Sequence, residues 1–191
     1  MKKTLLTVLL ATASAITFAD GSFTGAGLEV GAGATKSDVR NVNLNEKTKG
    51  DVAVRGSYNT QFGQSNWIGG VEAGVKPLHR KIAGNAKQKV DANVSYVQGY
   101  LLTDNALAYG KVGYHYGRFD NLGAKRNNMN GLGYGVGAKY AVAPNVEVGA
   151  EWEQTRYKKD NLKVHNNSYM ATVGYRSEEH TSELQSLREI S

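Results

Sequence analysis

The chain has 191 residues, of which 23 are Lys or Arg and 17 are Asp or Glu, for a formal net charge of +6. It contains no cysteine, which excludes disulfides, thiolate metal sites and cysteine nucleophiles. Mean hydropathy is −0.45. No apolar run reaches the length of about 18 residues that a spanning helix needs, but the strands of a transmembrane barrel alternate and leave hydropathy ordinary.

The first 19 residues have the pattern of a secretory signal peptide. A basic start at Lys2 and Lys3 precedes a short apolar stretch that ends in small residues. We expect cleavage after Ala19, with Ala15 as the alternative site. An uncleaved anchor helix is disfavoured because the apolar stretch is too short to cross a membrane.

From about residue 52 to residue 175, apolar and polar residues alternate with the period of two that is typical of β-strands. In residues 51–62 the even positions hold Val, Val, Gly, Tyr, Thr and Phe, while Asp51 and Arg55 lie on the odd side. The same segregation predicts eight strands, near residues 25–35, 51–62, 67–75, 89–101, 106–118, 131–142, 146–156 and 168–175.

Long and short connections alternate between these strands. Polar loops are predicted near residues 36–50, 76–88, 119–130 and 157–165, and short turns at residues 63–66, 103–105 and 143–145. The pattern predicts an all-β fold, an eight-stranded antiparallel up-and-down transmembrane β-barrel over residues 20–176. Outer-membrane barrels have short periplasmic turns and longer extracellular loops, so we expect both termini in the periplasm of a Gram-negative bacterium.

The aromatic residues indicate which face meets lipid. On the apolar face they gather near the two strand ends, as the two girdles of a membrane barrel do. We expect one girdle beside the short turns and one towards the long loops: Phe62, Trp67, Tyr100, Tyr140 and Tyr175 in the first, and Tyr114, Tyr116, Tyr134, Trp152 and Tyr169 in the second. A soluble lipocalin-like barrel would turn the same apolar face inward.

The opposite face carries charges of both signs among many glycines. We expect a lumen network of ion pairs formed by Glu29, Arg55, Glu72, Lys111, Lys139 and Glu151. An eight-stranded barrel is just wide enough for side chains to fill, so the network would close the lumen; the alternative is a narrow porin-like pore for ions or small solutes. The outward cations Arg118 and Arg156 fall at loop ends, where charge on the lipid face costs little.

No catalytic site, metal site or cofactor is expected. His165 and Ser168 are three residues apart and would point to opposite faces of a strand, which argues against a hydrolase. His115 has no second ligand at metal-binding spacing. The inward carboxylates Glu147, Glu151 and Glu153 would pair with lumen cations, because a narrow barrel offers a substrate no access.

Two loops are rich in basic residues. The cations expected there to bind polyanions are Lys76, Arg80, Lys81, Lys87, Lys89, Lys158, Lys159 and Lys163. Their partners would be the phosphates of lipopolysaccharide in the outer leaflet, or host glycans and acidic surface proteins. Nucleic acid is not an expected partner at an extracellular surface, despite a sequence pI of about 9.4.

With these features, residues 100–105 (YLLTDN) and 109–114 (YGKVGY) complete a resemblance to small outer-membrane β-barrel proteins of the OmpA, OmpX and opacity type. The resemblance covers about residues 22–176. It implies an integral, non-enzymatic outer-membrane protein, expected as a monomer, with an envelope-structural or adhesin-like role. It also implies recognition by the barrel assembly machinery through the last strand, where the usual terminal Phe is missing after Tyr175.

The C-terminal residues differ from everything before them. Residues 176–186 read RSEEHTSELQS and resemble translated sequencing adapter, so we expect residues 177–191 to be non-native. The alternative is a genuine helix-prone tail, since Leu184, Leu187 and Ile190 recur at every third position.

Overall fold

The computed structural model describes residues 23–40, 47–77, 80–83, 86–120, 127–159 and 162–177; within strands, the side chains of 38–40, 47, 80–83, 86–89, 119–120, 127, 158–159 and 162–163 are not described. The predicted signal peptide and the tail from residue 178 onward lie outside these residues. In this part of the chain every regular element is a strand. No helix found among these residues is long and apolar enough to cross a membrane.

Nine strands follow one another along the described chain. Their bounds are β1 Gly25–Arg40, β2 Lys47–Gln61, β3 Trp67–Lys76, β4 Arg80–Ala83, β5 Ala86–Thr103, β6 Ala106–Asp120, β7 Asn127–Ala143, β8 Val146–Lys159 and β9 Leu162–Ser177. β4 has four residues and pairs with β5 at one end of the molecule. The other eight are the barrel strands.

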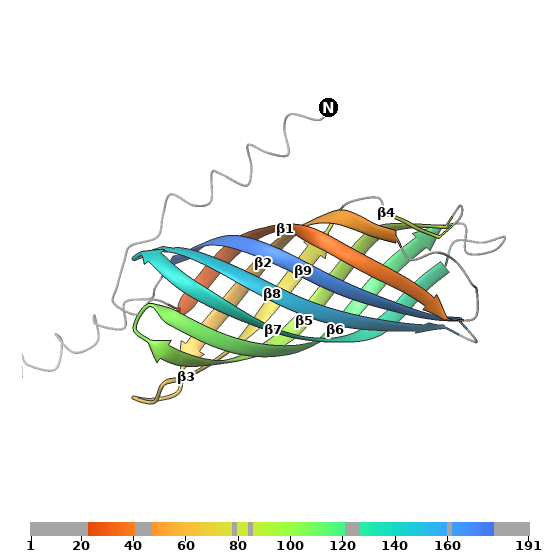
Figure 1. Ribbon diagram of the computed structural model, residues 1–191. Coiled ribbons are helices and arrows are strands. Elements are labelled where there is room, and N and C mark those ends of the chain that lie inside the picture. The colour runs from red at the N-terminus through yellow and green to blue at the C-terminus, as the bar shows by residue number, and fades with distance from the viewer. Residues whose placement is uncertain are drawn as a thin grey trace, which may run out of the picture.

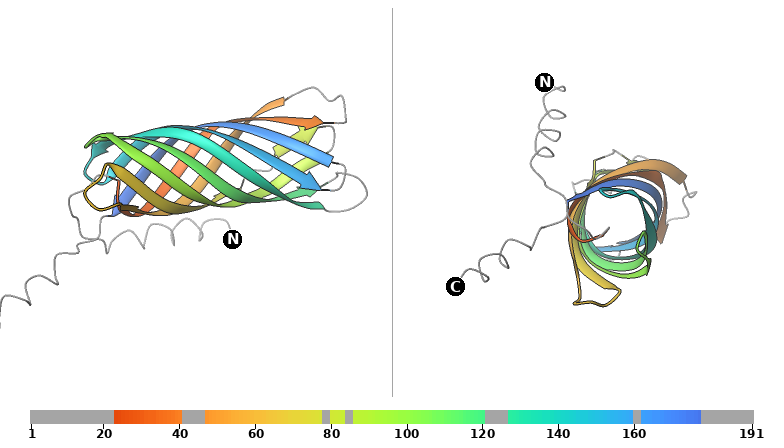
Figure 2. Two further views of the ribbon diagram at one scale, coloured as in Figure 1. Left: turned by 90° about the horizontal axis from the view of Figure 1, so that it is seen from below. Right: turned by 90° about the vertical axis from the view of Figure 1, so that its left-hand side faces the viewer.

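These eight strands form a closed antiparallel barrel. Each pairs with its chain neighbour, β1 pairs with β9, and β3 pairs with β5, so the ring has no free edge. Figure 1 shows the strands tilted across the long axis of the barrel, and the end-on view in Figure 2 shows the closed ring. The predicted eight-stranded antiparallel fold is confirmed.

The two ends of the barrel differ. The connections β2–β3, β5–β6 and β7–β8 are short and lie together at one end, which we call the turn end. The opposite end, called the loop end, holds β4 (Figure 1). The predicted strand boundaries were wrong here: β1 continues to Arg40 and β2 begins at Lys47, inside the predicted loop 36–50, and residues 80–83 and 86–88 pair as a hairpin. Polar residues take over the outer face there while backbone pairing continues, so the alternation of apolar residues ended before the strands did.

Apolar side chains cover the outside of the barrel and charged ones fill the inside. Val71, Val112 and Val136 are 56 to 57% exposed, while the side chains of Glu29, Arg55, Glu72 and Lys111 lie within the lumen, all under 9% exposed as residues. A lipocalin-like barrel would show the reverse. This distribution is that of a barrel whose outer wall faces lipid.

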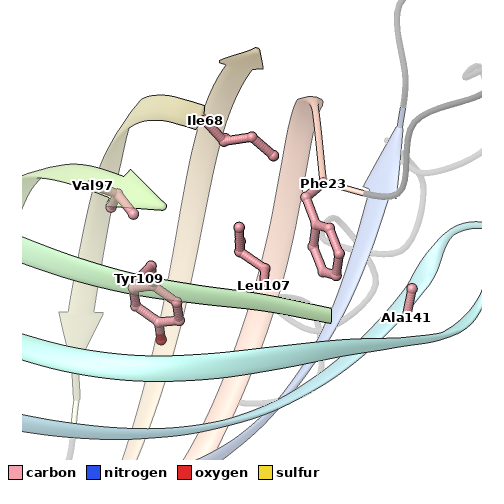
Figure 3. Packing of buried hydrophobic residues seen from close by; sticks show 6 residues of the cluster. All are labelled: Phe23, Ile68, Val97, Leu107, Tyr109 and Ala141. Atoms are coloured by element: carbon pink, nitrogen blue, oxygen red, sulfur yellow. The ribbon is translucent and has the colours of Figure 1, made fainter. Parts of the chain in front are cut away.

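The turn end of the lumen is filled by apolar side chains. Phe23, just before β1, packs in one buried cluster with residues near the turn-end halves of four strands (Figure 3): Ile68, Val97, Leu107, Tyr109 and Ala141. The cluster is a small apolar plug, and further buried apolar side chains, Met129, Val164 and Met170, lie outside it. Beyond it, towards the loop end, the lumen is occupied by charged and hydrogen-bonding groups.

Candidate functional site

The middle of the lumen is organised around Arg55 on β2. Its guanidinium Nη1 lies 2.8 Å from Glu29 Oε1 on the neighbouring strand β1, and Nη2 lies 2.8 Å from Glu151 Oε1 on β8. Nε is 3.8 Å from Glu72 Oε1 on β3. One planar cation therefore links three carboxylates from three strands, a use that suits the fork of donors on guanidinium.

Lys111 on β6 completes the same centre from the other side. Its ammonium lies 3.1 Å from Glu72, 2.9 Å from Glu151 and 2.9 Å from Glu153. Two of these carboxylates are shared with Arg55, so the two cations and their acids form one connected cluster. Sharing keeps each buried charge next to an opposite one, as burial in a low-dielectric interior requires.

The cluster continues towards the turn end through Lys139 on β7. The Lys139 ammonium lies 2.7 Å from Glu29 Oε2 and 2.7 Å from Glu147 Oε1. Arg176 on β9 is 3.2 Å from the same Glu147 oxygen and donates a hydrogen bond to the carbonyl of Gly25 at 3.1 Å. Arg176 thus ties the last barrel strand to the start of the first one.

Towards the loop end, the network continues from Glu153 Oε1 to the ammonium of Lys76 on β3, 2.9 Å away. His115 Nδ1 lies 3.3 Å from Asp91 Oδ1, and Tyr157 donates a hydrogen bond to Asp91 Oδ2 at 2.7 Å. His115 Nε2 is 3.9 Å from Glu153 Oε2, which joins this group to the rest.

The prediction that Lys76 belongs to a polyanion-binding loop was wrong. Lys76 is the last residue of β3, is 7% exposed and pairs with Glu153 inside the barrel. The strand alternation already indicated this, because Lys76 is four positions after Glu72, and residues an even number of positions apart lie on one face of a strand. Its position at a predicted loop boundary concealed that signal.

Together these contacts form a continuous network of ion pairs and other polar contacts along the lumen. The structure brings all six predicted lumen residues into it and adds seven groups: Lys76, Asp91, His115, Glu147, Glu153, Tyr157 and Arg176. The odd or even position of a residue in its strand indicates that most of these side chains point inward. It does not say which inward side chains contact one another. That depends on the stagger of the strands around the barrel, which the sequence does not display.

Glycines on β7 make room for two bulky side chains of β6. A Cβ at Gly137 would lie 2.5 Å from the Tyr109 ring, and one at Gly133 would collide with the His115 ring. Tyr109 donates a hydrogen bond to Glu151 Oε2 at 2.9 Å, and the Lys139 ammonium lies 5.7 Å from the centre of its ring. Because these glycines have no side chain, they leave space on the lumen side for the Tyr109 and His115 rings.

The chemistry available to the described lumen is ion pairing and hydrogen bonding. Glu147, Glu151 and Glu153 each contact a cation at 3.2 Å or less. Ser168 is buried and lies 2.9 Å from the Thr35 hydroxyl, which donates a hydrogen bond to Asp51. Because alternate residues of a strand face opposite sides, His165 and Ser168 do not share a face of β9.

The predicted girdle residues lie on the outer wall. Nine of the ten are exposed and Trp152 is partly exposed. Trp67 and Tyr100 meet edge to face at 5.0 Å near the turn end, and Tyr134 and Trp152 do so at 5.9 Å towards the loop end. Such pairs stabilise aromatic positions beyond the area they cover.

The remaining predicted polyanion-binding residues are Arg80, Lys81, Lys87, Lys89, Lys158, Lys159 and Lys163, and their side chains lie outside what the structure describes. Their backbone register is described. Lys81 is paired with Lys87 across the β4–β5 hairpin, and Lys158 with Lys163 across β8 and β9. Two pairs of like-charged residues therefore stand at opposed strand positions at the loop end.

A family model and a curated relative both relate this chain to outer-membrane proteins. The model described as "Outer membrane protein beta-barrel domain" matches residues 4–176. Outer membrane protein X of Enterobacter cloacae is 37% identical over 83 residues, which cover 40% of this chain and 46% of that protein, so the match spans about half of its length.

Two solved structures are similar in fold. Neisserial surface protein A has a TM-score of 0.58 at 18% identity, with 80% of this chain and 97% of that one covered. Ail, the attachment invasion locus protein of Yersinia pestis, has a TM-score of 0.51 at 16% identity, with 80% and 100% covered.

Replacing Arg55 tests whether the network stabilises the barrel. Arg55→Gln would leave Glu29 and Glu151 facing each other without their shared cation, so we expect the free energy of unfolding in lipid vesicles to fall by about 3–5 kcal/mol. Urea titration would measure it. Arg118→Gln, which removes an exposed guanidinium, is the matched control and should change stability by less than about 0.5 kcal/mol. Equal effects of the two variants would contradict a stabilising network.

Proposed function

The chain belongs to the outer membrane protein β-barrel family, and from that premise we propose that it acts at the cell surface through its basic loop end while its lumen stays closed to solutes. The observation that carries the proposal is the unbroken ion-pair path from Arg176 to Lys76. A barrel that fills its lumen in this way presents its function on its outer surfaces.

Two features support a closed lumen. The network side chains are buried and come from strands all around the ring, so they cross the interior at several heights. The apolar plug of Phe23, Ile68 and Leu107 fills the turn end (Figure 3). An ion entering from either end would have to displace paired charges or cross an apolar constriction, and both are costly.

We assign the loop end to the extracellular side and the termini to the periplasm. Barrels of this class have short periplasmic turns and longer extracellular loops. β2, β5, β6, β7, β8 and β9 each have at least 14 residues, more than the roughly 9–11 needed to cross the hydrocarbon core. The surplus at the loop end would raise the basic hairpins above the membrane surface.

The backbone register at the loop end supports the proposed binding of polyanions. Like charges at directly opposed positions of an antiparallel pair are destabilising. The backbone register sets Lys81 opposite Lys87 and Lys158 opposite Lys163. A sulfated glycan or a lipopolysaccharide phosphate lying between the two cations of a pair would offset that destabilisation.

The name of one structural neighbour is in keeping with this role. Ail is called an attachment invasion locus protein, and it shares the barrel fold with this chain. We infer by analogy an adhesin-like or envelope-structural role, without enzymatic activity, for a protein that functions as a monomer.

A narrow pore is the second candidate, favoured by the polar loop-end half of the lumen. There the Thr35 hydroxyl donates a hydrogen bond to Asp51 and lies 2.9 Å from the Ser168 hydroxyl. A polar interior is what water-filled barrels have. The two candidates differ in whether the central ion pairs ever part.

Conductance separates them. Purified, refolded protein in planar bilayers should give no stable unitary currents, because the central pairs and the apolar plug close the lumen. Protection of the barrel from protease in matching vesicles would verify that it has inserted. Reproducible single-channel steps from the wild-type protein would reject the closed lumen and favour the pore.

Affinity for heparin tests the basic loop end. The variant K81Q/K87Q removes one opposed pair of cations and should elute from immobilised heparin at lower salt than the wild type, because fewer cations then contact the polyanion. The matched control K36Q/K49Q removes two cations from β1 and β2 at the same end, where Lys36 lies opposite Thr48 and Lys49 opposite Thr35. We expect a clearly smaller shift for the control; equal shifts would show that only net charge matters.

A further inference from the structure

A groove lies on the outer wall of the barrel near the loop end. Its volume is about 390 Å³, within the range of small-molecule sites, and it is lined by Tyr114, Asn130, Gly131, Leu132, Tyr134 and Arg156. The register of three adjacent strands produces it: Tyr114 of β6 is opposite Leu132 of β7, which is opposite Arg156 of β8. Leu132, 66% exposed, lies in the middle of this row.

The guanidinium of Arg156 is held in place at the edge of this groove. Its Nη2 donates hydrogen bonds to the Tyr134 hydroxyl at 3.1 Å and to Gln154 Oε1 at 3.0 Å, and its carbon lies 5.6 Å from the centre of the Tyr134 ring. Tyr134 in turn donates to Gln154, whose amide donates to Asn167 at 2.9 Å. The cation is therefore pre-positioned by neutral groups.

No acidic partner balances this charge within the described residues. Every contact given for Arg156 there is to the neutral Tyr134 and Gln154. An exposed cation on a wall that faces lipid needs an anion from its surroundings, and guanidinium matches the geometry of phosphate oxygens.

The height of Arg156 on the barrel is that of a headgroup layer. It lies ten residues along β8 from Val146 at the turn end, and about 9–11 tilted residues cross the hydrocarbon core. Trp152, four residues earlier on the same face of β8, pairs with Tyr134 in the aromatic girdle. Leu132 and Tyr114 then lie where acyl chains begin.

We propose that this groove binds one phosphate-bearing membrane lipid, with its phosphate on Arg156 and an acyl chain over Leu132. The apolar floor selects a lipid over a free phosphate ion, because a free ion gains nothing from Leu132 and Tyr114. The site rests on the proposed placement of the barrel in a membrane but is independent of the basic hairpins and of whether the lumen conducts.

Native mass spectrometry of the refolded barrel in detergent tests the proposal, with dioleoyl phosphatidylglycerol as the probe. The wild type should retain one lipid more tightly than any other. R156Q should weaken that binding about tenfold, the loss expected for one charge-assisted contact, and L132N should weaken it by a smaller factor. R118Q, which removes an exposed cation of the outer wall outside the groove, is the matched control and should leave binding unchanged.

Two further probes identify the ligand chemistry. Dioleoylglycerol, which has the same chains without phosphate, should bind much more weakly, and inorganic phosphate should not displace phosphatidylglycerol. An equal loss of phosphatidylglycerol affinity in R156Q and R118Q, or no loss of affinity in L132N, would overturn the site. Equal affinity of the wild type for phosphatidylglycerol and dioleoylglycerol would also overturn it. Failure of this test would reject the lipid site alone. The proposed function would still be tested separately, by the heparin affinity of K81Q/K87Q and by the conductance of the wild type.

Discussion

The structure depends on one constraint: a charge inside a narrow barrel that crosses a membrane must have a partner. The interior of an eight-stranded barrel is filled by its own side chains, so little water is available to solvate an isolated ion. Arg55 and Lys111 meet this constraint by contacting four carboxylate groups between them, with Glu72 and Glu151 shared. Strands that are distant in sequence are thereby fixed relative to one another across the lumen, in addition to the hydrogen bonds between neighbours.

The same constraint explains why this barrel has charged side chains inside and apolar side chains outside, the reverse of a soluble globular protein. With lipid outside, burial of apolar surface does not hold the strands together, and the valines of the outer wall remain exposed to the acyl chains. The apolar side chains that do lie inside are gathered at the turn end around Phe23 and Leu107. On the outer wall, the guanidinium of Arg156 is held by hydrogen bonds to Tyr134 and Gln154.

The sequence was sufficient for the strand count, the direction of each face and the identity of the central charges, because all three follow from a period of two. It was insufficient in two respects. Apolar alternation stops before backbone pairing does, so β1 and β2 were predicted too short and Lys76 was placed in a loop. The alternation also does not tell which inward side chains become partners. Arg55 and Glu151 are 96 residues apart, and their contact depends on how the strands are staggered when the ring closes.

The central claim, that the lumen charges are paired with one another, is tested most directly by solid-state NMR of the protein in lipid bilayers. Dipolar couplings between the Lys111 side-chain nitrogen and glutamate carboxyl carbons report their separation. We expect strong couplings to Glu151 and Glu153, whose oxygens lie 2.9 Å from that nitrogen, and an ammonium shielded from solvent exchange. A Lys111 nitrogen without coupling to any carboxyl carbon, and in rapid exchange with water, would contradict it.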